Sequence, residues 1–539
     1  MDTYTSAVTQ AHSRPVPTEA SGPPSSRRFT GRRVVGSWPL LPVLVTQTVL
    51  SLRLVRADTA FQDEALSLWA GHLQWAHWLH GTAIPPFPYY FSGAPAIYPP
   101  LGALADSVAG LAGARALSLV FMLGATTLVW STTRRRYGSR AAFFAAGLFA
   151  VLGPTLHLGA FATYDAMALF LVALAAWCVL GAKERGDATA RMAAAGAVLA
   201  LANAAAYPTI LFDVVVIALA LLSALPTPGG RTTVWRRVTT LVVVLGALLS
   251  AGLLIGGGAY LSGFRQTVLA PVEHTDSPLT VLANSWYWAG PLILVAAGGV
   301  TLSWVRREGR ARTWLLVVLT LAVILGPAEQ AWLHTAALLN EHVGLGAWFA
   351  AIAAGYAVER FIAGAPARRQ QAIISAACLA ALVFPALLGA AQSWTLATSW
   401  PNATSFIAIL RPLANHGNGH LLVEDPAVAR YYLPSGTVWR RWSSTRNIIL
   451  PTGTDTGGPP GTTGIMAAGS AATFTRFIAN GYFSYVALNF TDTTGLDHGL
   501  ATELHRNPNY HIIQVVPYGT EVKPIGLGTY VIWKYEPPR

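Results

Sequence analysis

The sequence predicts a polytopic α-helical membrane protein that ends in a small α/β domain. The 539 residues are 53% hydrophobic and only 11% charged, against about 25% charged in typical soluble domains. Long apolar stretches recur between residues 38 and 392, which is the pattern of membrane-spanning helices. After residue 392 the apolar stretches become short and strand-like.

We expect about 11 transmembrane helices, because successive basic clusters are each separated by two apolar spans. Cytoplasmic loops carry the excess of Lys and Arg in membrane proteins, so all clusters are placed inside. The N-terminus is then cytoplasmic and the C-terminal end extracytoplasmic. The basic clusters lie at 27–33, 134–140, 183–191, 231–237, 306–312 and 360–369. The expected spans are 38–56, 114–133, 141–158, 164–181, 192–206, 208–225, 238–261, 285–304, 314–328, 343–358 and 371–391.

Three regions follow from this pattern. Residues 1–37 are rich in Ser, Pro, Thr and Arg and are expected to form a disordered cytoplasmic tail. Residues 38–392 form the transmembrane module. Its first outward loop, residues 57–114, contains an amphipathic interfacial helix over Ala65–His80 and a second short helix from Tyr98.

Residues 393–539 are expected to form an extracytoplasmic α/β domain, because strand-like segments alternate with helical ones. The sequence carries no dinucleotide fingerprint, P-loop or nucleophile elbow. Its net charge of +12 comes mostly from arginines in the clusters, so we expect no nucleic-acid partner. The expected strands are His420–Val423, Tyr485–Asn489, Tyr510–Val516 and Thr529–Tyr535, and the helices Ala472–Asn480 and Leu496–Arg506.

Acidic residues at the outer face indicate a functional site. Asp63 and Glu64 directly follow the first span, and Asp165 opens the fourth span at the same expected depth. Carboxylates this close to a bilayer are costly and usually functional. The alternatives are a solvated helix start for the Asp63–Glu64 pair, and a carboxylate that complements the helix dipole for Asp165.

Several motifs occur in a recognisable order. Asp63-Glu64 is followed by Pro99-Pro100, by Arg115 at the start of span two, by the turn Arg134–Arg140, and by Tyr164-Asp165 at span four. This order resembles the membrane glycosyltransferases of the GT-C class, specifically the branch of protein O-mannosyltransferases and lipid A aminoarabinose transferases (glycosyltransferase family 39-like). The resemblance extends over about residues 55–185. In the aminoarabinose transferases an acidic metal ligand and a Lys precede the proline motif, whereas Ile97 and Tyr98 stand here.

The resemblance implies sugar transfer from a polyprenyl-phosphate donor to a glycan, lipid or protein acceptor at the outer face of the plasma membrane. Hexosyl and pentosyl transfer both stay open. The displacement is expected to be direct and inverting. Asp63 is the expected base for the acceptor hydroxyl, with Glu64 as its neighbour or substitute. Asp165 orients a substrate or holds a divalent metal cation, and no cofactor is otherwise implied.

Further residues are expected to bind the substrates. A departing lipid phosphate needs cations or hydrogen-bond donors, and the candidates at the expected depth are Arg115, Arg265, His334 and His342. Tyr98 and Tyr164 are the other expected substrate-binding residues. Two other functions are weighed against the enzyme: a transporter or flippase of lipid-linked sugars, and a non-catalytic membrane anchor for the outer domain. Transporters place ionisable residues near the bilayer midplane, whereas these lie at one face.

Overall fold

The computed structural model describes most of the chain beyond the expected N-terminal tail. The tail, residues 1–37, lies outside the described residues. These are 39–85, 87, 97–182, 187–225, 230–265, 276–415, 419–433, 439–449, 465–467, 470–491, 493–518 and 529–537.

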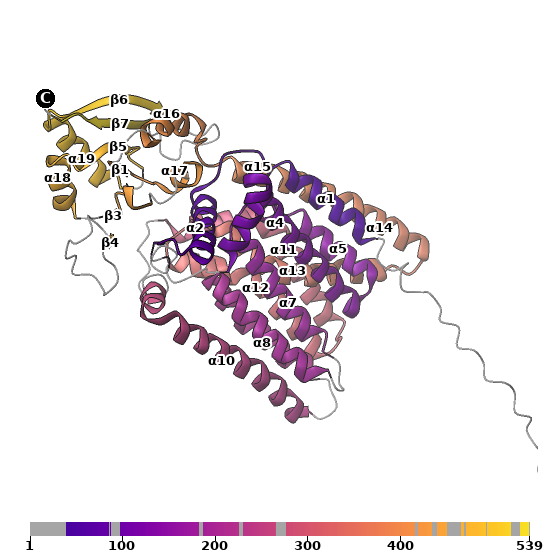
Figure 1. Cartoon of the computed structure of the whole chain (residues 1–539). Coiled ribbons are helices and arrows are strands. Elements are labelled where there is room, and N and C mark those ends of the chain that lie inside the picture. Colours follow the sequence, from indigo (N-terminus) through magenta and orange to yellow (C-terminus); the bar gives the residue numbers. More distant parts are fainter. Residues whose placement is uncertain are drawn as a thin grey trace, which may run out of the picture. The chain divides into compact units, whose positions relative to one another are not determined.

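Each of the predicted spans falls on helical structure (Figure 1). Eight described helical regions are long and apolar enough to cross a membrane, and those at spans one, three and four are shorter. The chain is therefore a membrane protein, while the total of eleven spans stays a prediction. The helices are α1 (Leu40–Leu52), α4 (Tyr98–Tyr137), α5 (Ser139–Ala150), α6 (Gly153–Leu158), α7 (Asp165–Leu180), α8 (Ala188–Ala205), α9 (Ile210–Ala224), α10 (Gly230–Phe264), α11 (Pro278–Val305), α12 (Arg310–Trp332), α13 (Leu339–Ala363), α14 (Arg368–Ala381) and α15 (Val383–Ala397).

Several helices of the described bundle are interrupted, among them those of spans two and three. In α4, Gly110 has a φ of 63°, a left-handed conformation that glycine adopts without steric cost. The short helix predicted from Tyr98 is therefore continuous with span two across a kink. The third span is divided into α5 and α6, and a proline in the first turn of α6 suits a helix start, where its missing N–H costs no hydrogen bond.

The predicted interfacial helix is α2 (Gln62–His80), which packs directly on the start of α4. At the crossing, a Cβ on Gly71 would stand 1.9 Å from the Pro99 carbonyl oxygen, so only glycine allows this approach. The Trp75 indole donates to the Pro100 carbonyl oxygen over 2.8 Å. These contacts hold the middle of α2 against the start of α4.

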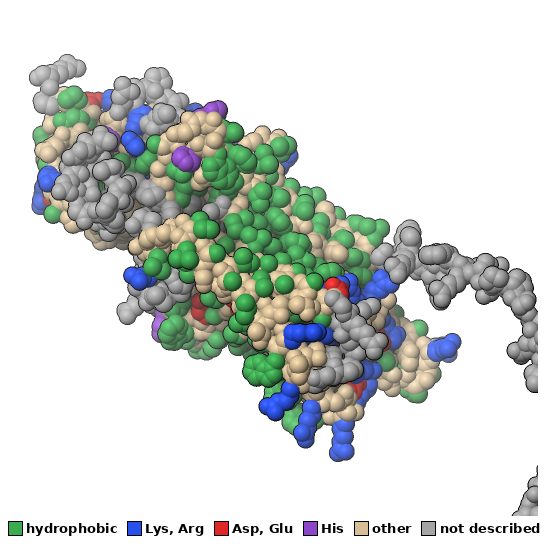
Figure 2. Space-filling model, turned by 60° about the horizontal axis from the view of Figure 1, so that its bottom comes forward, with side chains coloured by type: hydrophobic (Ala, Val, Ile, Leu, Met, Phe, Trp, Pro, Cys, Tyr) green, Lys and Arg blue, Asp and Glu red, His purple; other side chains and the backbone are tan. Residues whose placement is uncertain are grey.

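The surface of the bundle carries the apolar band that a bilayer requires. Large apolar side chains are exposed along α10 and α14–α15, with Leu254 at 83% and Phe384 at 67% of their full exposure. Figure 2 shows apolar side chains over a broad part of the face in view, and Lys and Arg gathered at one end of it. This separation agrees with the basic clusters of the sequence.

The C-terminal region contains a five-stranded sheet. The strand order is β2-β1-β5-β7-β6, with β1 parallel to β2 and β5, and β7 antiparallel to β5 and β6. β3 and β4 form a separate antiparallel pair. The strands are β1 (His420–Val423), β2 (Trp442–Ser443), β3 (Asn447–Ile449), β4 (Ile465–Ala467), β5 (Phe483–Leu488), β6 (Tyr510–Pro517) and β7 (Thr529–Tyr535).

Helices cover both faces of this sheet. Successive residues of a strand point to opposite faces, and Leu421 accordingly packs with α16 and α17 while Leu422 packs with α18 and α19. The six strands and helices that the sequence predicted here are present with boundaries shifted by at most two residues, whereas α16, α17, β2, β3 and β4 were not predicted. The helices are α16 (Thr404–Asn415), α17 (Ala427–Tyr432), α18 (Ala471–Ala479) and α19 (Thr494–Arg506).

The C-terminal region contacts the first outward segment. Residues Pro39–Arg539 form one compact unit, in which α17 packs on α2 through an apolar cluster that includes Ala65 and Ala429. The expected boundary between residues 392 and 393 stays a prediction. What matters for the site is that the carboxyl end of β1 leads directly into the helix that docks on α2.

Candidate functional site

Glu64 lies in the first turn of α2 and is completely buried. Its carboxylate accepts hydrogen bonds from the backbone N–H of Phe61 at 3.0 Å and of Ala162 at 2.7 Å. The first of these closes the helix start in the manner of a capping box. The second ties α2 to the segment that leads into α7.

Arg115 of α4 completes this arrangement with two parallel bonds to Glu64. Its Nε and Nη2 donate to the carboxylate over 2.8 and 2.6 Å, the bidentate geometry that makes such pairs strong. The remaining donors reach the carbonyl oxygens of Val55, Asp58 and Thr59 at 2.9–3.2 Å. The sequence predicted Glu64 as a substitute base and Arg115 as a ligand of the phosphate. In the structure the two side chains are already hydrogen-bonded to each other. The geometry therefore favours a positioning role for both.

Asp63 is the adjacent residue, and it is not among the hydrogen-bond partners of this pair. Its side chain keeps partial exposure in a confined environment. Burial, and after it the nearby carboxylates of Asp165, Asp425 and Glu64 in that order, raise the pKa of Asp63 to about 7. A carboxyl group that titrates near neutrality suits a general base, which must both take up and release a proton.

Asp165 stands at the start of α7 and belongs to the same carboxylate group. Its Oδ2 accepts from the Thr163 hydroxyl at 2.8 Å, and its carboxyl group is hydrogen-bonded to that of Glu341 at the start of α13. Tyr164, partly exposed, lies within electrostatic range of Asp63 and Glu341. The structure thus brings together Asp63, Tyr164 and Asp165 as expected, and adds Glu341.

His342 is buried behind this group, at 6% exposure. Its Nδ1 lies 3.1 Å from a carboxylate oxygen of Glu329 and 3.2 Å from the side-chain amide of Gln330. Both partners come from the outer end of α12. His342 therefore connects the carboxylate group to α12, which fits a supporting role better than a direct substrate contact.

Of the other predicted substrate ligands, Tyr98 lies within electrostatic range of Glu64 and Asp165. Tyr98 is fully buried, with its hydroxyl 3.5 Å from that of Ser118. His334 is exposed, and its ring and backbone bond to the backbone of Asp276. Arg265 is exposed directly after α10. The interpretation of Tyr98 as a substrate ligand does not fit its burial, whereas Arg265 and His334 remain accessible.

Asp106 is a further acidic residue that sequence reasoning missed. Its carboxylate lies 2.6 Å from Nε2 of His72 on α2. It also accepts a hydrogen bond from the hydroxyl of Tyr431 on α17 at 2.6 Å. The only sequence signal is an acidic residue in the short outward helix before the kink. It joins three elements, and we regard it as a structural link.

A metal centre is not evident in the described part of the chain. Among those residues, no group of three or more His, Cys, Asp or Glu side chains is arranged to hold a metal ion. The expectation that Asp165 holds a divalent cation stays a prediction. No step of the chemistry below depends on it.

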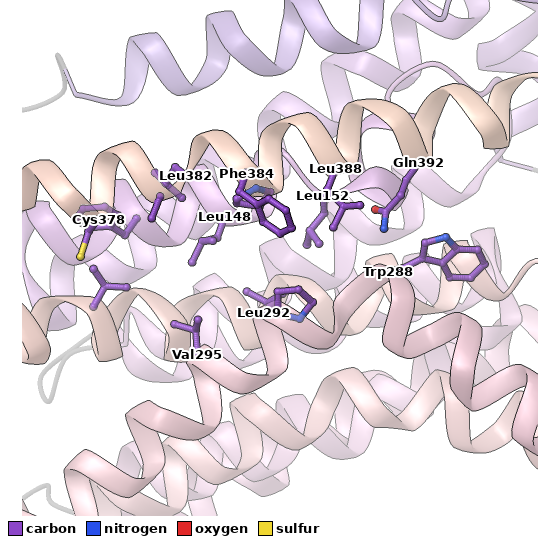
Figure 3. A pocket seen from close by; sticks show the side chains of 15 residues that line it. Leu148, Leu152, Trp288, Leu292, Val295, Cys378, Leu382, Phe384, Leu388 and Gln392 are labelled. Carbon is purple, nitrogen blue, oxygen red and sulfur yellow. The ribbon is translucent and has the colours of Figure 1, made fainter.

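An apolar groove runs along the membrane-embedded side of the bundle, between α5, α11 and α14–α15. It encloses about 240 Å³ and is lined almost entirely by apolar side chains. Figure 3 shows Trp288 and Gln392 at one end of it, where the Gln392 amide donates to the Tyr287 carbonyl oxygen at 2.7 Å. None of the carboxylates above lines this groove, so it suits hydrocarbon and not a sugar.

Comparison with known proteins identifies the fold. Residues 103–255 match the family model of dolichyl-phosphate-mannose-protein mannosyltransferases. The structure of ArnT from Cupriavidus metallidurans bound to undecaprenyl phosphate superposes with a TM-score of 0.58 at 13% identity, covering 93% of this chain and all of ArnT. The chain has the GT-C fold.

A second GT-C structure agrees over a similar part of the chain. The Archaeoglobus fulgidus oligosaccharyltransferase in its apo form gives a TM-score of 0.53 at 15% identity, covering 90% of this chain and 74% of that enzyme. No curated protein sequence matches significantly. At these identities the likeness establishes the GT-C fold.

Proposed function

We propose that this protein transfers a sugar from a polyprenyl-phosphate donor to an acceptor at the outer face of the membrane. The observation that carries the proposal is Asp63: a carboxylate that titrates near neutrality, at the outer end of a bundle with the GT-C fold. The match to a mannosyltransferase family model and the likeness to ArnT, whose structure holds undecaprenyl phosphate, support the donor class.

The chemistry requires one base and one leaving group. Asp63 in its ionised form accepts the proton of the acceptor hydroxyl as that oxygen attacks the anomeric carbon. A bond forms between the acceptor oxygen and this carbon, while the bond from the carbon to the donor phosphate oxygen breaks. The phosphate leaves with the bonding electrons, and the configuration at the carbon inverts.

The neighbouring groups prepare these steps. The Glu64–Arg115 pair fixes the first turn of α2, so that Asp63 is held in place. Asp165 and Glu341 share a hydrogen bond and are suited to bind sugar hydroxyls. The departing phosphate needs a cation. Of the arginines predicted for this purpose, Arg115 is already bonded to Glu64, whereas Arg265 is exposed.

The topology is part of the proposal. Because the basic clusters mark the cytoplasmic side, the carboxylates and the C-terminal domain lie outside. A lipid-linked donor can then reach Asp63 from the bilayer, and the C-terminal domain adjoins the acceptor side.

The test is transfer in proteoliposomes that contain the purified full chain and a panel of labelled polyprenyl-phosphate sugars. Wild type should consume one donor, and Asp63→Asn should not. Asp187→Asn is the matched control, since Asp187 pairs with Arg191 in one of the basic clusters, and it should remain active. Donor that crosses the bilayer unchanged, equally in wild type and Asp63→Asn, would establish a transporter and overturn the enzyme.

A further inference from the structure

The short segment that leads from the first span into α2 is fixed by the buried ion pair of the site. The Arg115 guanidinium, which is bonded to Glu64, also donates to the carbonyl oxygens of Asp58 and Thr59 at 3.0 and 3.2 Å. The Glu64 carboxylate closes the helix start from the other side. Asp63 lies between these two anchoring points in the chain, so its place depends on how firmly the segment is held.

The connection from the last span to the C-terminal region bonds to the same segment. It runs from the end of α15 to the start of α16, and it contains Trp400. The Trp400 indole N–H donates to the Thr59 carbonyl oxygen at 2.9 Å, the oxygen that the guanidinium group also reaches. The Ala403 backbone N–H donates to the Thr59 hydroxyl at 3.0 Å. The Asn402 side-chain amide donates to the Asp58 carboxylate at 2.8 Å. Thr59 is thus held by the bundle and by this connection together.

The Trp400 ring also packs against the residue directly before α2. Trp400 is 8% exposed, and its ring centroid lies 5.2 Å from that of Phe61. Both rings contact Phe161, with centroids 5.8 Å apart for Phe61 and 6.0 Å apart for Trp400. Because Phe61 is the N-cap residue of α2, the position of the Trp400 ring bears on the start of this helix.

A further contact from the C-terminal region lies between these two. The Ala60 backbone N–H donates to the Tyr432 hydroxyl of α17 at 2.9 Å. Ala60 is itself buried in an apolar cluster that includes Ala403 and Phe406. The bonds of the connection therefore belong to a larger contact, which reaches each residue from 58 to 61.

We propose that Trp400 is a positioning residue for Asp63, which it fixes by holding the Thr59 carbonyl oxygen and the Phe61 ring, and that Asn402 supports it. The inference rests on the proposed function for its catalytic meaning. Holding a reacting group in the right geometry lowers the barrier of the chemical step, and such a group needs a surrounding layer of packed and hydrogen-bonded side chains. The connection to the C-terminal region is then part of the catalytic arrangement.

The first experiment measures amide hydrogen exchange of the full chain in detergent, without any substrate. Trp400→Phe keeps an aromatic ring and removes the donor for Thr59. The amides of residues 59–64 should exchange roughly two- to tenfold faster, which is the effect of losing one hydrogen bond, while those of α18 and α19 stay as in wild type. Unchanged exchange at residues 59–64, or an equal increase in α18 and α19, overturns the proposal.

The matched control is Trp394→Phe, the same substitution on α15 at a side chain that is 46% exposed. It should leave exchange at residues 59–64 as in wild type. If Trp400→Phe yields no folded protein, Asn402→Ala takes its place, because Asn402 is exposed and its loss removes only the bond to Asp58. Exchange at residues 59–64 must then be faster in Asn402→Ala, and equal exchange overturns the proposal.

The second experiment measures transfer in proteoliposomes. In Trp400→Phe the kcat per folded molecule should fall roughly two- to tenfold, with the KM for the donor unchanged, because a misplaced base weakens the transition state and not donor binding. Trp394→Phe should keep both constants. A raised KM with unchanged kcat in Trp400→Phe overturns the proposal. A wild type without transfer overturns the proposed function alone, because the exchange result still decides whether Trp400 holds the segment before Asp63.

Discussion

The two sides of the first turn of α2 carry adjacent carboxylates with opposite surroundings. Glu64 is completely buried and fully paired with Arg115 and two backbone N–H groups. Asp63 is partly exposed, faces other carboxylates, and has its pKa raised to about 7. Adjacent acids in a sequence are thus given different roles by the partners that the fold brings to each. One side of the turn holds the structure together, and the other carries the proposed base.

The largest expected effect is on the reactive side. Asp63→Asn should lower kcat by about 100- to 10,000-fold, the usual contribution of a general base. Its thermal stability in detergent should be equal to or above that of wild type, because the variant removes repulsion from Asp165. Transfer assays and unfolding curves on the same preparation provide the measurement. A loss of stability as large as that of an Arg115 variant would break the comparison.

On the structural side, Arg115→Met should leave Glu64 buried without its counter-charge. Breaking a buried ion pair by removing one partner costs about 3–5 kcal/mol, so little folded protein is expected in detergent. The control is Arg506→Met, which removes an exposed ion pair worth at most about 1 kcal/mol. Equal unfolding temperatures for the two variants would contradict the assignment.

The pairing can be sharpened with a double variant. Glu64→Gln combined with Arg115→Met removes both charges, so it should be more stable than Arg115→Met alone. Coupling energies of contacting residues are about 0.5–3 kcal/mol. The measurement is the unfolding free energy of the two single variants and of the double variant. If the two single changes in unfolding free energy simply add up in the double variant, Glu64 and Arg115 are not energetically coupled.

The smallest expected effect is on the pH dependence of stability, at Asp497. This residue lies outside the site and tests how burial changes the pKa of a carboxyl group in the C-terminal region. Burial first, and Glu424 second, raise the pKa of Asp497 to about 7, against about 3.9 in an unfolded chain. The folded state therefore binds this proton more tightly, and its stabilising contribution is lost as pH rises through about 7. Asp497→Asn should unfold with a smaller decrease in midpoint temperature between pH 5.5 and pH 8 than wild type. Parallel pH dependences in the two proteins would contradict this.

Much of the fold could be predicted because its signals are local. Apolar stretches and basic clusters located the helices, and alternating short segments located β1 and β7 to the residue. Asp63 and Asp165 could be assigned to one site from the sequence, because counting spans gives the two residues the same expected depth in the bilayer. These inferences use no contact between distant segments.

The remaining site could not be predicted because it depends on such contacts. Glu64 and Arg115 are 51 residues apart, and no local pattern distinguishes a paired carboxylate from a free one. The C-terminal region meets α2 through the docking of α17, a contact between segments that lie far apart in the sequence. His334 and His342 share the same outward segment, yet one is exposed and the other buried, because the turn between α12 and α13 separates them.

The order of strands in the sheet also bears on how the protein is made. β7, formed by Thr529–Tyr535, lies between β5 and β6 and pairs with both. During synthesis α2 emerges early, whereas β7 emerges only after β5 and β6, the strands on both sides of it. The apolar cluster that joins α2 to the C-terminal region includes Tyr530 and Ile532 of β7. This cluster is therefore complete only after β7 has been made, and the early helix waits for a late partner.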